Sequence, residues 1–308
     1  MDRLEAMSML VTVTEAGSLS AAGRRLNVPL ATLSRKISDL EALLGTQLLI
    51  RTTRKLSLTD AGAAYVMAAR RILEQVVQAE REAAGEFDAP TGELVITAPI
   101  QFGRLHVLPL VAEFLAQFPD INIRLLLSDR NIDLVDAHVD MAVRIGTLPD
   151  SSMVATHIGL MRTVVCASPA LMDERGVPAT PDDLIRLPCV TVDALQPISG
   201  WLFKAPVSGA RIEVPVKSRL SVTTTEAAAA AAVRSVGITR LLHYQVDDAE
   251  QAGLLRIILD TYEPEPVPVT LLHVSRAHMP LKMRRFLDFA APRLRKTLAE
   301  LMRSPVPL

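Results

Sequence analysis

The sequence is poor in cysteine and in aromatic residues. Only two cysteines, Cys166 and Cys189, occur in 308 residues, and we expect them to be two buried thiols in a reducing cytosol. The alternative is that the two cysteines form a redox-active pair. The sequence alone does not show whether the two sulfurs lie within bonding distance. Aromatic residues make up 4% and hydrophobic residues 49% of the chain, which predicts aliphatic, helix-rich cores in two or more domains.

Long hydrophobic runs and a strong net charge are also absent. No stretch approaches about 18 uninterrupted apolar residues, so we expect no membrane-spanning helix. The first ten residues carry Asp2 and Glu5 and no long apolar run, and we therefore expect a cytoplasmic protein without a secretory signal. The formal net charge of −1 argues against a general binder of polyanions.

Signatures of catalysis are missing as well. The chain has no Gly-x-Ser-x-Gly elbow, P-loop, His-Glu-x-x-His or dinucleotide fingerprint, and we expect no enzyme and no cofactor other than a small effector. None of the histidines shows the spacing of metal ligands, so no metal site is predicted. They are His106, His138, His157, His243, His273 and His278.

Positive charge is instead concentrated between residues 24 and 55, where seven Lys and Arg face two acids, a net charge of +5. The pattern there predicts a short helix over Leu19 to Leu26, a turn at residues 27–29 and a second helix over about Leu30 to Leu44. A further helix over residues 2–16, ended by Gly17 and followed by the cap Ser18, would support this pair. Two helices joined by so short a turn match the helix-turn-helix, whose second helix enters the DNA major groove.

The second helix has an apolar and a polar face. We expect the apolar positions, three to four residues apart, to face the core: Leu33, Ile37, Leu40 and Leu44. On the opposite face Arg35 can donate to a guanine edge, and Thr32 and Ser34 can reach a base or a phosphate. Lys36 adds charge there, while Leu30 and Ala31 at the N-terminal tip offer only apolar contact. An ordinary solvated helix is the alternative.

Two short apolar strands, 48–50 and 56–58, flank a basic tip that contains Arg51, Arg54 and Lys55. Such a wing can place cations along phosphates or in the minor groove. Thr59 then caps a long helix that is predicted to continue to about Phe87, a length of about 42 Å. Its apolar stripe, which includes Ile72, is too long to be covered by a 58-residue domain, so we expect a dimer on a pseudo-palindromic site in double-stranded DNA.

After a hinge at residues 88–92, strands and helices alternate, which predicts a largely parallel sheet covered by helices. Two α/β lobes joined by two crossings would enclose a cleft for a small ligand. The expected strands are 93–98, 121–128, 141–145, 163–168, 189–192, 237–241 and 267–274, and the expected helices are 103–118, 131–137, 226–235 and 280–302.

The order and spacing of these features resemble the LysR-type transcriptional regulators over essentially the whole chain. The residues that carry the resemblance are SLSAAGRRLNV, ATLSRKISDLEALLGTQLLIRTTRKLSLTDAG, TAPIQFGRLHVLPLVAEFLAQFPDI, DLVDAHVDMAVRIGTLPDSSM and VVCASPALM. The resemblance implies a winged helix-turn-helix domain (1–58), a linker and dimerisation helix (59–88) and an effector domain of the type II periplasmic-binding-protein fold (89–308). In that domain, lobe I would comprise about 92–162 and 268–302, and lobe II about 163–267.

The resemblance further implies a bacterial repressor or activator that binds DNA as a homodimer or dimer of dimers, with RNA polymerase as a partner if it activates. Its DNA contacts would fall on Leu30, Ala31, Ser34, Arg35 and Arg51. The chain departs from the family, which commonly has Gln at the position of Leu30 and often Pro at that of Ala31. Without that amide the operator cannot be taken from the family consensus.

The family's effector site carries over to three segments. They are the end of the first strand (Thr97, Ile100, Gln101 and Phe102), the RIG turn (Arg144, Ile145, Gly146 and Thr147) and the start of a later helix (Thr223, Thr224 and Thr225). Helix N-termini facing a cleft favour an anion, and with Arg144 as counter-charge they suggest a small carboxylate effector. Thr223 and Glu226 have capping-box spacing, so a purely structural role for that segment is equally compatible with the sequence.

Three other functions are compatible with parts of the sequence. An enzyme in the α/β half would not need residues 1–58. A redox-sensing regulator would use Cys166 and Cys189, and an architectural DNA binder would leave the cleft without a purpose.

Overall fold

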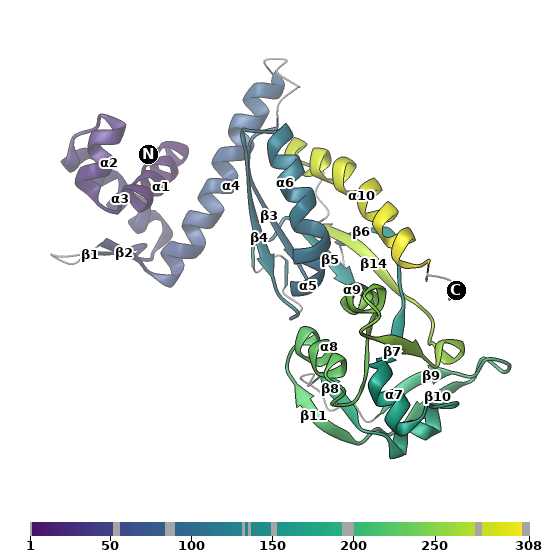
Figure 1. Ribbon diagram of the computed structural model, residues 1–308. Coiled ribbons are helices and arrows are strands. Elements are labelled where there is room, and N and C mark those ends of the chain that lie inside the picture. The colour runs from purple at the N-terminus through teal and green to yellow at the C-terminus, as the bar shows by residue number, and fades with distance from the viewer. Residues whose placement is uncertain are drawn as a thin grey trace. The chain divides into compact units, whose positions relative to one another are not determined.

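Two compact units, Met1–Gly92 and Glu93–Leu308, make up the chain. In the computed structural model (Figure 1) the described residues are 2–51, 56–83, 90–130, 133–134, 137–148, 153–192, 200–274 and 279–303. Each unit has its own hydrophobic cores, and we describe each by itself.

The first unit is a small helical domain with a two-stranded sheet. Its elements are α1 (Arg3–Ala16), α2 (Leu19–Leu26), α3 (Leu30–Leu44), β1 (Leu49–Arg51), β2 (Leu56–Leu58) and α4 (Asp60–Ala83). The expected helices and the turn between α2 and α3 are therefore confirmed. The long helix is confirmed over its first 24 residues, and residues 84–89 lie outside the described part.

Local signals end and begin these helices. The Asp2 side chain accepts from the N–H of Leu4 at 2.9 Å, and Ser18 accepts from Ala21 at 3.2 Å, so each caps the helix that follows it. Gly17, with φ 68°, ends α1 in the left-handed conformation that favours glycine. Each cap lies within one turn of the helix it ends or begins, which is why the sequence pattern locates these boundaries so closely.

The core of the first unit lies between α1, α3 and the start of α4. Leu33, Ile37 and Leu40 are completely buried and pack with residues such as Leu10. The expectation that Leu44 also faces this core is wrong, because it is 39% exposed. It occupies the last turn of α3, directly before the cap residue Gly45.

The second unit contains two five-stranded sheets. The first has the order β4-β3-β5-β14-β6 and the second the order β11-β8-β12-β7-β13. We call them and the helices on them lobe I and lobe II. The strands are β3 (Gly92–Ala98), β4 (Ile121–Leu127), β5 (Met141–Ile145), β6 (Met153–Met161), β7 (Thr163–Ala167), β8 (Cys189–Val192), β11 (Ser218–Val222), β12 (Ile238–Leu242), β13 (Arg256–Ile258) and β14 (Val267–Val274), with β9 (Trp201–Lys204) and β10 (Arg211–Val214) as a separate pair.

The expectation of a largely parallel sheet is wrong. β3 and β5 are parallel, but β14 runs antiparallel to both β5 and β6. In lobe II, β12 is parallel to β8 and antiparallel to β7. The reason is the double crossing: the chain enters lobe II through β7 and returns to lobe I through β14, and each of these strands runs against a neighbour. Both sheets are therefore mixed.

Helices cover the sheets as shown in Figure 1. They are α5 (Ile100–Phe102), η1 (Gly103–Val107), α6 (Leu108–Gln117), α7 (Pro169–Arg175), η2 (Pro181–Arg186), α8 (Thr225–Val233), η3 (His243–Gln245), α9 (Asp247–Gln251), η4 (Asp260–Tyr262) and α10 (Leu281–Leu301). Residues 100–117 run through α5, the π-helical η1 and α6 without a break.

The helix expected at 131–137 is not present in the described residues of that segment. Asp133 and Ala137 close one turn, with an N–H to carbonyl distance of 3.0 Å. His138 then adopts φ 53°, and the N–H of Val139 reaches back to Leu134 at 2.8 Å. Residues 131, 132, 135 and 136 of the expected helix lie outside the described part of the structure.

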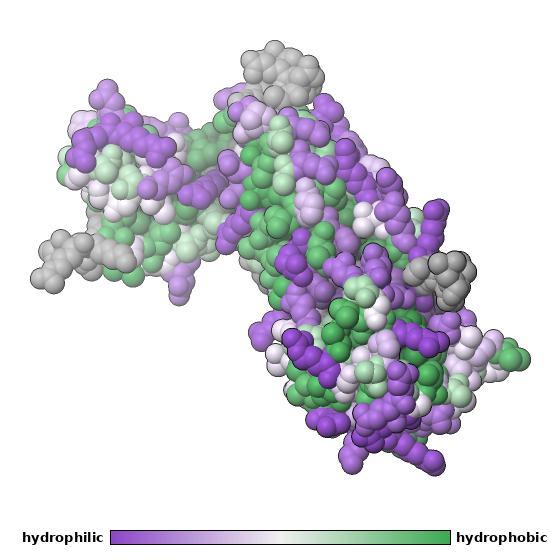
Figure 2. All heavy atoms as spheres, in the orientation of Figure 1, coloured by the Kyte–Doolittle hydropathy of each residue, from purple (hydrophilic) through white to green (hydrophobic). Residues whose placement is uncertain are grey.

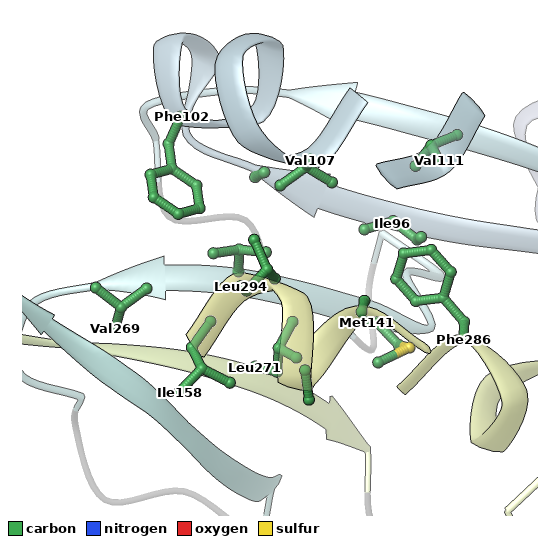
Figure 3. Close-up of a cluster of buried hydrophobic side chains, with 14 of the residues drawn as sticks. Ile96, Phe102, Val107, Val111, Met141, Ile158, Val269, Leu271, Phe286 and Leu294 are labelled. Atoms are coloured by element: carbon green, nitrogen blue, oxygen red, sulfur yellow. The ribbon is translucent and has the colours of Figure 1, made fainter. Parts of the chain in front are cut away.

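The main core of the second unit lies in lobe I, between its sheet and α6 and α10. Figure 3 shows Ile96 and Met141 from the sheet facing Phe286 and Leu294 from α10. Phe114 of α6 and Phe286 meet edge to face, with ring centroids 5.1 Å apart. Burial of these side chains fixes the end of β3 and the start of α5, where the first group of candidate effector residues lies.

Candidate DNA-binding and effector sites

The exposed face of α3 carries the candidate DNA contacts. Arg35, Ala31 and Leu30 are exposed, and Thr32 and Ser34 are half-buried beside them. Arg35 makes no ion pair within the described residues, so its guanidinium is available to a base or phosphate. Because the other face of α3 is completely buried, this is the side that a DNA groove would meet.

Several neighbouring cations are already paired inside the first unit. The Lys36 ammonium contacts the Glu5 carboxylate of α1. Glu15 of α1 accepts from Arg25 of α2 at 3.2 Å and from Arg70 of α4 at 3.4 Å. These pairs hold α2, α3 and α4 on α1. Arg35 differs from Lys36, Arg25 and Arg70 in that it takes no part in these pairs.

The connection from α3 to the wing is built by two polar side chains. Glu41 Oε1 accepts from the N–H groups of Leu48 and Leu49, at 2.8 and 3.1 Å. Thr59 Oγ1 donates to the carbonyl of Gln47 at 2.7 Å and accepts from the N–H of Gly62 at 2.9 Å, as its expected capping role requires. The wing thereby has a defined position relative to α3.

The strands of the wing, β1 and β2, pair antiparallel with Leu49 opposite Leu58 and Arg51 opposite Leu56. Arg51 has its backbone in β1, and its side chain lies outside the described part of the structure. Arg54 and Lys55 at the tip also lie outside the described residues.

Two of the candidate effector residues belong to the core of lobe I. Thr97 is completely buried, and its hydroxyl donates to the carbonyl of Leu126 at 2.9 Å. Phe102 is also completely buried and meets Tyr244 edge to face at 5.3 Å. Their surroundings point to a supporting role at the lobe boundary.

Gln101 and Arg104 join lobe I to lobe II. The hydroxyl of Thr225 donates to Gln101 Oε1 at 3.1 Å, and Gln101 Nε2 approaches the carbonyl of Gln245 at 3.5 Å. Arg104 pairs with Glu226 at 3.1 Å. The start of α5 therefore meets the start of α8, and two of the three expected segments are brought together. Thr225 belongs to the expected third segment. Glu226 was expected only to cap the helix, and Arg104 was not among the residues selected from the sequence.

The remaining member of the first segment, Ile100, is 39% exposed. Its N–H donates to the carboxylate of Asp129 at 2.9 Å. An acidic side chain therefore already occupies this helix N-terminus, and an anionic ligand would have to bind beside it or displace it.

The RIG turn follows β5, whose partner β3 leads into α5. Arg144 and Ile145 are half-buried, and burial lowers the pKa of the Arg144 guanidinium. Gly146 has φ 112° and donates its N–H to Pro268 at 2.8 Å, while Thr147 is exposed. Because β3 and β5 are parallel, this turn lies at the same edge of the sheet as the start of α5.

At the start of α8 the expected capping box is wrong by one residue. Thr224, not Thr223, is the N-cap, and its hydroxyl accepts from the N–H of Ala227 at 3.2 Å. Glu226 turns toward Arg104 instead of the helix terminus. Thr223 and Thr224 are both exposed.

The two thiols do not form a pair. Cys166 and Cys189 are both buried and free. They belong to hydrophobic clusters on opposite faces of the lobe II sheet, in strands separated by β12. Two strand spacings amount to about 9.6 Å, beyond the reach of a disulfide. Burial raises the pKa of each thiol to about 12, so the reactive thiolate is scarce at neutral pH.

Comparison with protein families assigns both units. The family model described as the LysR substrate binding domain matches residues 87–295, and that of the lysR family of bacterial regulatory helix-turn-helix proteins matches residues 4–63. The chain belongs to the LysR family.

Individual LysR relatives match along most of their length. An HTH-type transcriptional regulator of Xanthomonas campestris pv. campestris (strain 8004) is 32% identical over 288 residues, covering 93% of this chain and 84% of that protein. The solved structure of CrgA, a LysR-type transcriptional regulator from Neisseria meningitidis, is 30% identical with a TM-score of 0.60, covering 94% of this chain and 98% of that one. The full-length Vibrio cholerae virulence activator AphB gives 26% and 0.59, with coverage of 94% and 98%.

This LysR-family chain is accordingly a DNA-binding transcriptional regulator with a substrate-binding domain, and not an enzyme. Among the residues that the structure describes, no helix is both long and apolar enough to span a membrane.

Proposed function

We propose that this LysR regulator reads a pseudo-palindromic operator as a homodimer, with α3 of each copy in a major groove. The observation that carries the proposal is the exposed, unpaired guanidinium of Arg35 on a helix whose other face is completely buried. An exposed arginine at this place can donate two hydrogen bonds to a guanine. Leu30 and Ala31 would supply apolar contact, with Thr32 and Ser34 beside them.

Within this proposal the basic residues have different roles. Lys36 is paired with Glu5, so we propose that it holds α3 against α1. It would contribute to the positive potential near DNA but would not contact a base. Arg51 and Arg54 of the wing would neutralise phosphates, which adds affinity without sequence preference.

Exposed apolar side chains support the homodimer. On α4, Ile72 is 37% and Val77 46% exposed, although the helix is amphipathic. On the second unit, Leu108 of α6 and Leu127 of β4 are 48% and 37% exposed, and Figure 2 shows hydrophobic residues over this face. Burial against a second copy would remove both surfaces from water.

We propose further that the effector is a small carboxylate that binds at the lobe boundary. Two of the contacts that join the lobes there use a side-chain oxygen as acceptor, Gln101 Oε1 for Thr225 and the Glu226 carboxylate for Arg104. A ligand carboxylate can replace either acceptor, with Arg144 at the same edge of the lobe I sheet. Binding would replace a direct contact between the lobes with a contact through the ligand. The ligand would thereby change the relative position of the two lobes.

Selection of genomic DNA by the purified protein, followed by footprinting, tests the regulator. We expect a compact site with dyad symmetry. Binding that depends only on salt and not on sequence would contradict base reading by α3 and favour an architectural role.

Calorimetric titration with small aliphatic and aromatic carboxylates and their primary amides tests the effector class. We expect at least one acid to bind, its amide not to bind, and Arg104→Gln to weaken the acid at least tenfold. Arg124→Gln, an exposed arginine on β4, is the control that should leave binding unchanged. Equal binding of acids and amides, or no heat from any acid, would remove the carboxylate proposal.

A further inference from the structure

Three ligand-type side chains converge where β12 ends. His243 opens η3, and Asp247 and Glu250 follow in α9, so the three are spaced by four and three residues. The ring nitrogen Nε2 of His243 lies 2.8 Å from Glu250 Oε2 and 3.9 Å from Asp247 Oδ1. One ligand atom from each residue lies within 4.8 Å of the others.

The contact of the other ring nitrogen of His243, Nδ1, determines which tautomer the ring adopts. Nδ1 lies 2.9 Å from the carbonyl oxygen of Leu301, the last residue of α10. A carbonyl can only accept, so Nδ1 carries a proton. In the neutral ring Nε2 is then an acceptor, and it faces two carboxylates that are also acceptors. Either a proton on Nε2, donated to Glu250, or a bound metal ion must therefore lie between these groups.

The surroundings hold these groups in place. The Leu301 carbonyl fixes the tautomer and the orientation of the ring, and Gln251 Nε2 donates to Asp247 Oδ2 at 2.9 Å, which leaves Oδ1 directed at the ring. Such outer hydrogen bonds are the usual support of metal ligands. The His243 side chain is 1% exposed, but those of Asp247 and Glu250 are 22% and 16% exposed, so the site has one side open to water.

We propose that His243, Asp247 and Glu250 bind a divalent transition-metal ion of the zinc class. An imidazole nitrogen with two carboxylates suits zinc better than calcium or magnesium, which prefer oxygen alone. Two ligands about 2.1 Å from a zinc ion at a tetrahedral angle lie roughly 3.4 Å apart. Zinc would therefore move the Glu250 oxygen outward from its 2.8 Å separation from Nε2 and draw the Asp247 oxygen inward from 3.9 Å, each by about half an ångström. The ion would fasten α9 of lobe II to the end of α10 in lobe I through the imidazole.

Zinc titration of the full-length chain at neutral pH, competed against a chromophoric zinc indicator, tests the site. We expect one zinc ion per chain and a higher melting temperature with zinc. Glu250→Gln and His243→Gln should each weaken zinc at least tenfold. X-ray absorption at the zinc edge should show one imidazole among oxygen ligands.

The matched control is Asp248→Asn, which removes the same charge from an exposed neighbour in α9 and should leave zinc binding unchanged. Because His243 is buried, His243→Gln is used only if circular dichroism shows that it is folded. If it is not folded, Glu250→Gln is the deciding variant. If the wild-type chain binds no zinc, the proposal is wrong, and His243 carries a proton on Nε2 that it donates to Glu250. Equal weakening by Asp248→Asn, or full binding by Glu250→Gln, would overturn it as well.

Discussion

Arg35 carries the most direct expectation for a single residue. Arg35→Ala should cost about 1–3 kcal/mol of binding to the selected operator and relax base preference, because a bidentate contact to guanine is lost. Fluorescence anisotropy on operator and scrambled DNA at two salt concentrations measures it. Arg25→Ala removes an equal charge from an exposed arginine already paired with Glu15, and should cost less. An equal loss of affinity on scrambled DNA would make Arg35 a phosphate contact.

Gly62 of α4 lies where there is no room for a side chain. A Cβ added there would lie 2.0 Å from the carbonyl oxygen of Leu48, so we expect Gly62→Ala to destabilise the first unit by about 1–3 kcal/mol. Gly to Ala in an open helix stabilises by about 1 kcal/mol, and the sign therefore reports the clash. Denaturant unfolding followed by circular dichroism measures it, with Ala64→Gly as the reference for helix propensity. A more stable Gly62→Ala variant would show that the contact relaxes without cost.

Single residues also show the limit of the sequence. The exposure of Arg35 follows from helical periodicity, because Leu33 and Ile37 on either side define the buried face. The engagement of Lys36 does not, because its partner Glu5 lies 31 residues away on another helix. Periodicity tells which face a side chain is on, and it does not tell which charge meets it there.

At the scale of an element, α4 is the test of dimerisation. Ile72→Asp would place a carboxylate in the proposed seam, where an unpaired charge is strongly unfavourable. We expect the mass in solution to fall toward that of one chain, as measured by sedimentation equilibrium. Gln75→Asp adds the same charge at an exposed polar position of α4 and should leave the mass unchanged. If Ile72→Asp also keeps the dimer mass, the seam lies on another surface.

Elements were predictable where their signals are local. The boundaries of α2, α3, β5 and β14 agree with the sequence because helix caps and short apolar runs are signals that lie within a few residues. The helix expected at 131–137 lies mostly outside the described residues, and His138, which follows it, adopts a left-handed conformation that the sequence did not indicate. The sheets came out mixed, not parallel, because strand direction depends on the order in which the chain crosses between lobes.

At the scale of the whole effector unit, one ion pair joins the two crossings between the lobes. Arg162 follows β6, and Glu263 precedes β14. Arg162 Nη2 and Nε donate to the two carboxylate oxygens of Glu263 at 2.6 and 2.8 Å, and the side chains are 13% and 16% exposed. The hydrogen bond to Glu263 raises the pKa of Arg162.

We expect Glu263→Gln to destabilise this unit by roughly 3 kcal/mol, because it removes the carboxylate charge that faces a largely buried guanidinium. Arg162→Met with Glu263→Leu should restore most of the loss. Calorimetric thermal unfolding of the full chain measures both. Glu265→Gln, at an exposed residue paired with Lys204, should change stability by less than about 1 kcal/mol. A loss as small as that of the control would show that the pair contributes little.

The buried thiols predict how stability depends on pH. In the folded state burial holds the pKa of Cys166 and Cys189 at about 12, whereas unfolded thiols ionise near about 8.5. Above about pH 8.5 the folded chain therefore keeps protons that the unfolded chain loses, and the free energy of unfolding falls as pH rises toward 12. Each thiol contributes up to about 1.4 kcal/mol per pH unit.

Denaturant unfolding at pH 7.5, 9 and 10.5 measures this dependence. Cys166→Ala or Cys189→Ala should make the alkaline decline less steep, while neither variant changes the pH dependence below pH 8. The same slope in wild type and variants would assign the decline to other groups.

The sequence by itself determined the helix-turn-helix, the wing strands, the long helix and the alternating α/β half, and with them the family. These features are encoded in neighbouring residues, because caps and burial periodicity act over one or two turns. Only the tertiary structure decided which candidate site residues meet. Gln101 reaches Thr225 across 124 residues, and His243 reaches Leu301 across 58. Such contacts depend on how two sheets are joined, and no local pattern in the chain records that arrangement.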